Sequence, residues 1–243
     1  MPCARGHEFC AACVDRILKV GDNRNCPKCR APFPKFVSEW LSMIKIYPTY
    51  LTKDIPLEKL QIAFPLICCV AKLSIVTKCV KMGIDINTEG FQEFFPVQIA
   101  SQTDVLKYLV EHGADVNQPD NDGFTPLLMG SQNGHLPVVQ YLVENGADVN
   151  QTRNDGVTPL YISSQKGHVL VVQYLVENGA DVNQNTNNGA TPLAIAIYSN
   201  HTEVAKFLLN KNANIKATKL CLKNNNLLAQ IDILEDLCKQ MEE

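Results

Sequence analysis

Apolar and polar positions recur along residues 57–216 with a period of 33 residues. In the clearest copy, Val138, Val139, Leu142 and Val143 place an apolar face at helical spacing. The stretch LPVVQYLVENGADVNQ that contains them returns almost unchanged as VLVVQYLVENGADVNQ. Such a pattern predicts stacked helical hairpins, because one hairpin alone cannot bury its apolar face.

Each predicted hairpin carries its own start and stop signals. Thr125 stands before Pro126, and a capping hydroxyl followed by proline in the first turn predicts a helix N-terminus. Gly134 predicts the left-handed end of that helix, and Gly146 predicts the end of the second helix. The β-turns between hairpins are predicted at the Asn-Asp-Gly triplets, residues 121–123 and 154–156.

This pattern resembles the ankyrin repeat over about residues 57–216. The resemblance implies a mainly α fold, an ankyrin-repeat solenoid of about five helix-turn-helix repeats with β-turn tips. We expect the repeats at 57–87, 88–117, 118–150, 151–183 and 184–216. The second repeat is short and lacks the Gly-His pair of the others. Family members carry a histidine after the Thr-Pro-Leu triplet that ties neighbouring turns; this chain has Leu128, Tyr161 and Ala194 there, so packing must replace those ties.

Two segments flank the predicted repeats. Residues 217–243 place Leu227, Ile231, Leu234, Cys238 and Met241 on one helical stripe. We expect a C-terminal capping helix; a dimerising coiled coil is the alternative, although the stripe lasts barely two heptads. Residues 34–56 are expected to form a linker with a short amphipathic helix, either a spacer or a helix docked on the first repeat. Docking is favoured because Trp40 would otherwise be exposed.

Residues 1–33 concentrate side chains that bind metal. Two Cys-x-x-Cys pairs and a preceding Cys and His supply six soft ligands within 27 residues. This spacing indicates structural zinc, whereas a catalytic thiol would need only one cysteine near a base. The six potential ligands are Cys3, His7, Cys10, Cys13, Cys26 and Cys29.

The segment resembles the latter part of a RING-type zinc finger, without that family's first ligand pair. The resemblance implies two interleaved sites, one complete and one reduced to a pair. The complete site would consist of Cys3, His7, Cys26 and Cys29, and the half site of Cys10 and Cys13. Two alternatives stay open: one zinc bound by the four cysteines of the two Cys-x-x-Cys pairs, or no stable zinc fold. A true truncation and a start assigned inside a longer reading frame would both leave this pattern.

The RING resemblance also implies an activity. RING fingers recruit a ubiquitin-conjugating enzyme and orient its thioester, which is catalysis by positioning and not by a nucleophile. Val14 and Pro27 match the contacts to that enzyme, and Arg30 matches the cation that holds enzyme and ubiquitin together. Local packing of Val14 and a solvated Arg30 are the alternatives. Because the missing pair normally stands beside a further contact, we expect a weak or inactive ligase, and enzyme activity is left undecided.

Composition excludes several other functions. The net charge is −3, with 46% apolar and 19% charged residues, which is globular and lacks the clustered cations of a nucleic-acid binder. The longest uncharged stretch is too short to span a membrane. With no secretory leader pattern and cysteines at metal spacing, we expect a reducing intracellular location, in the cytoplasm with the nucleus not excluded.

The ankyrin resemblance places a protein partner or substrate on the concave surface. Phe124 and Tyr198 are the expected anchors, because aromatic residues dominate interface energies. Asn and Asp at the turn tips also have a structural explanation. A pure ankyrin scaffold with a vestigial zinc site is the alternative function. The expected contact residues are Asn121, Asp122, Phe124, Gln132, Asn133, Asn154, Asp155, Val157, Gln165, Lys166, Asn187, Asn188, Ala190, Tyr198 and Ser199.

Overall fold

The computed structural model describes residues 57–70, 73–89, 95–100 and 103–240. Within these ranges every regular element is a helix, which agrees with the predicted mainly α fold class. The chain divides into two compact units, one ending at Asp115 and the other beginning at Val116. The predicted zinc segment, 1–33, and the predicted linker, 34–56, lie outside the described residues.

Unit 1 contains two helical pairs in its described part. The helix α3 packs against α4 and α5, and α6 packs against α4 and α5. Leu60, Phe64 and Ile67 on α3 are fully buried, and the Cys79 thiol on α4 joins this core. Burial raises the pKa of Cys79 to about 11, so this cysteine behaves as a small apolar residue. The helix bounds are α3 (Leu57–Val70), α4 (Leu73–Lys81), α5 (Pro96–Ile99) and α6 (Thr103–Glu111).

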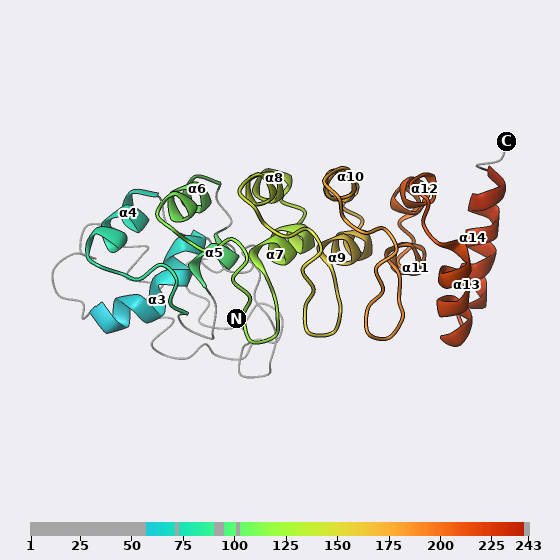
Figure 1. Cartoon of the computed structure of the whole chain (residues 1–243), viewed down its shortest axis with the longest axis horizontal. Coiled ribbons are helices and arrows are strands. Elements are labelled where there is room, and N and C mark those ends of the chain that lie inside the picture. Colours follow the sequence, from blue (N-terminus) through green and yellow to red (C-terminus); the bar gives the residue numbers. More distant parts are fainter. Residues whose placement is uncertain (1–56, 71–72, 90–94, 101–102, 241–243) are drawn as a thin grey trace, which may run out of the picture. The chain divides into compact units, whose positions relative to one another are not determined.

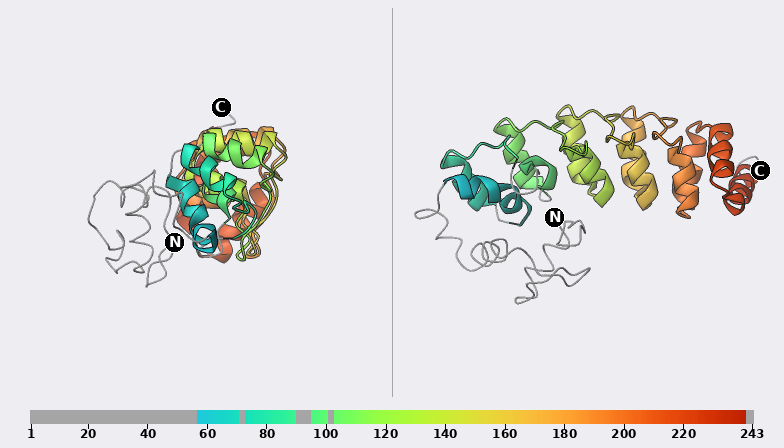
Figure 2. Two further views of the ribbon diagram at one scale, coloured as in Figure 1. Left: turned by 90° about the vertical axis from the view of Figure 1, so that its left-hand side faces the viewer. Right: turned by 90° about the horizontal axis from the view of Figure 1, so that it is seen from below.

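Unit 2 repeats one helical hairpin at regular intervals. The first helices, α7, α9 and α11, form one row, the second helices α8, α10 and α12 form another, and long loops project beyond the first row (Figure 1). Seen from below, the helices of this unit lie side by side in a stack (Figure 2). The helix bounds are α7 (Pro126–Asn133), α8 (Leu136–Glu144), α9 (Pro159–Lys166), α10 (Val169–Glu177), α11 (Pro192–Tyr198), α12 (Thr202–Asn210), α13 (Ile215–Asn224) and α14 (Leu228–Gln240).

The first helices begin where the sequence predicts. The Thr125 hydroxyl accepts a hydrogen bond from the Leu128 backbone N–H at 3.1 Å, and Pro126 occupies the first turn. Thr158 and Thr191 cap α9 and α11 in the same way, each at 3.0 Å. The side chain of each threonine thus satisfies an N–H that the helix itself leaves unpaired.

Gly134 is required for two separate reasons. Its φ of 71° is left-handed, as predicted, and it ends α7. A Cβ atom on Gly134 would also lie 2.6 Å from Nδ1 of His168, which belongs to the next repeat. The His168 ring sits over this glycine and its Nε2 lies 3.0 Å from the Gln132 carbonyl oxygen. The Gly-His pair therefore joins consecutive repeats, and Gly167 and His201 repeat it.

A ladder of asparagine side chains also joins the repeats. The Asn117 amide donates to the Gly146 carbonyl at 3.0 Å, and its oxygen accepts from the Asp148 N–H at 2.8 Å. Asn150 makes the same two bonds to the following repeat, 3.0 and 2.8 Å long. In unit 1, Asn87 bonds Gly113 and Asp115 in the same pattern, and in unit 2 Asn183 bonds Asn212 and Asn214. Each rung satisfies backbone groups that the loop leaves unpaired.

Packing replaces the absent family histidines. Leu128 and Tyr161 are buried, and they form one apolar cluster with Val157 and Ile162. Phe124 packs against the edge of this cluster. The side chains after the Thr-Pro-Leu triplets thus join neighbouring repeats through apolar contact, as expected from the sequence.

The C-terminal segment differs from the predicted single helix over 217–243. It forms two helices, α13 and α14, which pack on each other and on α11. The break falls where Asn226 takes a φ of 57°, a left-handed conformation that asparagine tolerates and a helix cannot continue through. Leu234 and Leu237 of α14 are buried in this hairpin. Leu234 therefore packs within the chain, whereas the alternative coiled coil would use it between chains.

Candidate protein-interaction surface

Three loops of unit 2 end in equivalent tight turns, which we call fingers: finger 1 is residues 120–124, finger 2 is 153–157 and finger 3 is 186–190. In each, the first and fifth residues are joined by a backbone hydrogen bond of 2.9–3.0 Å, and the glycine N–H closes the turn on the first residue. The fingers are thus rigid hairpin tips that present their second and third residues to solvent.

Neighbouring fingers are tied by asparagine. The Asn154 amide donates to the Asn121 carbonyl at 2.9 Å, and its backbone N–H donates to the Asp122 carbonyl at 3.2 Å. Asn187 makes the same bonds to Asn154 and Asp155, at 3.0 and 2.9 Å. Asn154 and Asn187, expected as partner contacts, therefore also hold the fingers together, which agrees with the structural explanation for asparagine at these tips.

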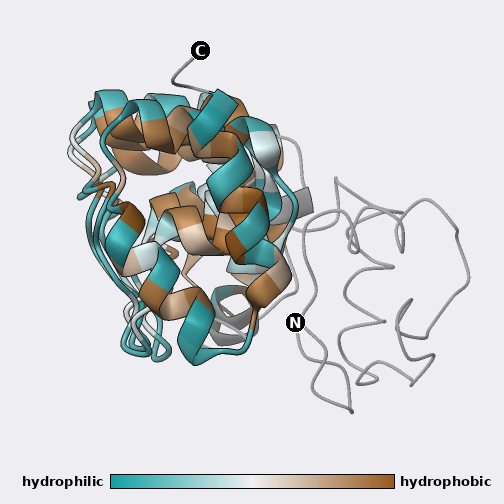
Figure 3. Ribbon diagram, turned by 90° about the vertical axis from the view of Figure 1, so that its right-hand side faces the viewer, coloured by the Kyte–Doolittle hydropathy of each residue, from teal (hydrophilic) through white to brown (hydrophobic). Residues whose placement is uncertain are grey.

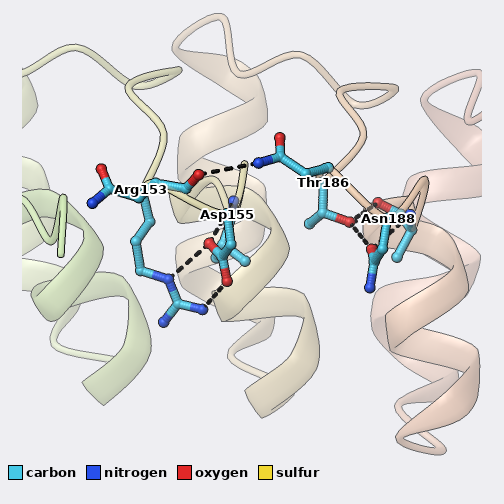
Figure 4. Close-up of polar contacts among 8 residues, drawn as sticks. Arg153, Asp155, Thr186 and Asn188 are labelled. Atoms are coloured by element: carbon cyan, nitrogen blue, oxygen red, sulfur yellow. Dashed lines mark hydrogen bonds and ion pairs between the residues drawn. The ribbon is translucent and has the colours of Figure 1, made fainter.

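Finger 2 carries an ion pair over an aromatic ring. Arg153 Nε donates to Asp155 Oδ1 at 2.8 Å, and a second guanidinium nitrogen pairs with the other carboxylate oxygen (Figure 4). The guanidinium carbon also lies 4.7 Å from the centre of the Phe124 ring on finger 1. The Arg153 hydrogen bond lowers the pKa of Asp155, so the pair is charged at neutral pH. This arrangement fixes both side chains at the edge of the surface.

A hollow of about 310 Å³ lies between finger 2, finger 3 and α9. Its floor is apolar and its rim consists of amide groups and the Arg153–Asp155 pair. Because the two rim charges neutralise each other, the hollow suits an uncharged side chain. It is lined by Arg153, Asp155, Val157, Tyr161, Ile162, Gln165, Thr186, Asn187 and Asn188.

A second hollow of about 310 Å³ lies between finger 3, α11 and α13. It shares Asn188 with the first hollow, so the two are adjacent along the surface. Tyr198 at its edge is 53% exposed, although it is aromatic. The hollow is lined by Asn188, Ala190, Ala194, Ile195, Tyr198, Cys221, Leu222, Asn225 and Leu227.

The expected contact residues fall into three groups. Val157 was predicted to be accessible but is buried at 6% exposure, because it turns inward from finger 2 into the apolar cluster. Phe124, the other expected anchor, is half-buried for the same reason. Also half-buried are Gln132, Asn133, Gln165, Ala190 and Ser199. Exposed are Asn121, Asp122, Asn154, Asp155, Lys166, Asn187, Asn188 and Tyr198.

Several lining residues escaped the sequence analysis. Arg153 and Thr186 begin fingers 2 and 3, at the position that Asp120 holds in finger 1. Because this position varies while its neighbours repeat, the variation was a usable signal of a site-specific role. Cys221 and Asn225 had no such signal, since they reach the second hollow only through the break between α13 and α14.

The geometry defines a class first: a helical repeat array whose turn tips and first helices form a binding surface. A family model described as ankyrin repeats (three copies) matches residues 66–153 and 149–219, which together exceed half of the chain. The chain belongs to the ankyrin-repeat family. No curated protein matches it.

The remaining predicted functions concern residues beyond those described. Within the described ranges, no three His, Cys, Asp or Glu side chains are grouped so that they could hold a metal ion. The six predicted zinc ligands and Val14, Pro27 and Arg30 all precede residue 57, so their roles stay predictions from sequence. None of the helices in the described ranges has the length and apolar character needed to cross a bilayer.

Proposed function

We propose that this chain binds a protein partner through the finger side of unit 2. The observation that carries the proposal is the pair of adjacent hollows that meet at Asn188. Each has an apolar floor and polar groups at its rim, which is the composition of specific binding sites. Exposed Tyr198 beside the second hollow supplies an aromatic anchor.

The chemistry of the hollows indicates what the partner presents. The apolar floors at Val157 and Ile195 favour uncharged, apolar side chains from the partner. Amide side chains such as Gln165 and Asn225 can both donate and accept, so they suit the backbone N–H and C=O groups of a polypeptide. We expect a partner segment that places apolar side chains in the hollows and its main chain along the amides.

A pair of substitutions tests the surface. The full chain carrying Tyr198→Glu is compared with Leu170→Glu, a matched change at a 63% exposed leucine on α10, outside both hollows. Partners captured by the unsubstituted chain are quantified by mass spectrometry and verified by direct binding of the purified proteins. A partner lost with Tyr198→Glu and retained with Leu170→Glu supports the proposal. Equal binding by all three chains contradicts it.

We further propose that residues 1–33 form a RING-like zinc segment next to this binding unit. The spacing Cys3, His7, Cys26 and Cys29 supports one complete zinc site, with Cys10 and Cys13 as a half site. Zinc analysis separates the arrangements. If the complete site holds the metal, Cys10→Ser with Cys13→Ser keeps one zinc per chain and His7→Ala loses it. The four-cysteine alternative predicts the opposite result for both variants.

The RING resemblance supports a role as a substrate-selecting ubiquitin ligase, weak because its first ligand pair is missing. Self-ubiquitination is measured with zinc and a panel of ubiquitin-conjugating enzymes. Ubiquitin chains that form with the native sequence and vanish with Arg30→Ala support the ligase role. If no enzyme of the panel gives ubiquitin chains, the second candidate holds, a pure ankyrin scaffold whose zinc site is structural.

A further inference from the structure

The C-terminal hairpin of unit 2 exposes two leucines on its outer side. Leu220 of α13 is 60% exposed, and Leu228 of α14 is 67% exposed. Leu220 stands two residues from buried Leu222, about 200° around a helix with 3.6 residues per turn. Leu228 stands nine residues from buried Leu237, about 180° around its helix. Both leucines therefore point away from the stack.

This exposure is unusual for the end of a repeat array. A terminal repeat needs a polar outer face, because no further repeat covers it. Figure 3 looks onto this end of unit 2, where hydrophobic segments interrupt the hydrophilic ones on the nearest helices. Leu220 lies one turn before the end of α13 and Leu228 begins α14, so both stand where the residues 225–227 join the helices. Together they form an apolar spot at one end of the hairpin.

The two helices around this spot have opposite charge. The helix α13 has three lysines and no acidic residue, whereas α14 has three acidic residues and one lysine. Lys219 pairs with Glu235 at 2.8 Å within the hairpin. On the outer face, Lys216 and Lys223 flank Leu220 at helical spacing. Asp232 lies one turn after Leu228.

We propose that this face pairs with the same face of a second copy of the chain. A two-fold axis places α13 of each copy against α14 of the other, so that lysines face acidic residues twice and Leu220 meets Leu228 twice. The charge complementarity favours this occupant, because a surface with one basic and one acidic half matches itself after a half-turn. This self-association is independent of the finger surface and of the zinc segment.

The size of the face sets the strength. A helix of 13 residues is roughly 20 Å long, and two adjacent helices are roughly 20 Å wide, so the face offers on the order of 400 Å² per copy. Stable interfaces bury about 800 Å² per partner. We therefore expect a weak dimer that forms as the protein concentration rises.

Sedimentation of the full chain under reducing conditions tests the pairing. The weight-average mass should rise toward that of a dimer with concentration. Leu220→Glu and Leu228→Glu should each weaken association by roughly 10-fold or more, because symmetry removes two contacts per substitution. The matched control is Leu170→Glu, which changes an equally exposed leucine outside this face and should leave association unchanged. Circular dichroism verifies that each variant is folded.

A charge exchange sharpens the test. Lys223→Glu and Asp232→Lys should each weaken association by about 3-fold or more, and the chain that carries both should recover it, since the attraction is restored with reversed signs. A chain that stays monomeric at every concentration overturns the proposal. So does a dimer that Leu220→Glu and Leu228→Glu leave intact, because the copies would then meet through another surface.

Discussion

The three regular repeats of unit 2 and the described part of unit 1 follow one plan with different thoroughness. Both use the asparagine rung, at Asn87 in unit 1 and at Asn117 in unit 2. The first helices differ. In unit 2, α7 has eight residues and a threonine cap, whereas α5 has four residues and begins at Phe95, which has no capping oxygen. The Gln98 side chain accepts from the Phe95 N–H at 3.0 Å instead.

The comparison separates what a repeat needs from what makes it regular. The rung persists where the helix cap and the Gly-His pair do not, so it is the minimal connection between one loop and the next. In unit 1 a glutamine can take the same role: Gln61 donates to the Asp85 carbonyl at 2.7 Å and accepts from its N–H at 2.9 Å. Four substitutions test this division, in order of falling effect.

The Gly-His pair gives the largest effect. Gly167→Ala should lower the free energy of unfolding by about 3 kcal/mol, since a left-handed alanine costs about 1–2 and the displaced His201 loses a bond worth about 1. Gly179→Ala is the control: its φ of 91° is equally left-handed, but no atom lies within 4 Å of the added Cβ. Urea denaturation measures both. Equal losses would show that the close approach of the ring has no energetic weight.

The asparagine rung comes second. Asn150→Ala removes two bonds between repeats and should cost about 2 kcal/mol. Asn178→Ala removes one bond within a single helical turn, to the Tyr174 carbonyl, and should cost about 0.5 kcal/mol. The midpoints of chemical denaturation give both values. If Asn178→Ala proved the costlier change, the rung would not be the essential connection.

Two serines should give a gain. Among the described residues, the buried hydroxyls of Ser131 and Ser164 are the side-chain groups without a hydrogen-bond partner. Replacing either with alanine removes an unsatisfied polar group and should raise stability by about 1 kcal/mol. Ser163→Ala is the control, because its hydroxyl donates to the Leu160 carbonyl at 3.1 Å and the change should give no gain. Thermal unfolding distinguishes the three, and a loss at both Ser131 and Ser164 would contradict the assignment.

The finger ion pair gives the smallest effect. The pKa of Asp155 is lower in the folded chain than in the unfolded chain, so its stabilisation is present at neutral pH. It disappears as the pH falls through the folded pKa. Because the Asp155 side chain is half exposed, Asp155→Asn should cost only about 0.5 kcal/mol at pH 7 and nothing in acid. Stability measured against pH for both chains gives the difference, which should shrink toward acid.

The sequence predicted the features that depend on one repeat at a time. Thr125, Pro126 and Gly134 act within a few residues of themselves, so spacing alone revealed their roles. Val157 was misplaced because the direction of a finger side chain depends on the neighbouring repeat. Arg153 was missed for the same reason: its significance lies in Phe124, a residue of the preceding finger.

The C-terminal segment shows a different limit. The apolar stripe that includes Leu234 was compatible with one long helix, and periodicity alone cannot reveal where a helix is interrupted. Three consecutive asparagines, residues 224–226, were the available signal, because Asn226 adopts the left-handed conformation that ends the pattern. The two hollows could not be predicted at all, since they form between repeats and not within one.

The asparagine rung has a consequence for how such a chain changes length during evolution. Each rung asparagine bonds the loop of the next repeat, and that loop supplies the next asparagine. A duplicated unit of 33 residues therefore meets the partners it left, and its neighbours keep theirs. Recombination between the nearly identical stretches at 136–151 and 169–184 would yield longer or shorter arrays whose junctions are chemically the same. The number of hollows, and with it the length of ligand recognised, can change in whole steps while the fold is preserved.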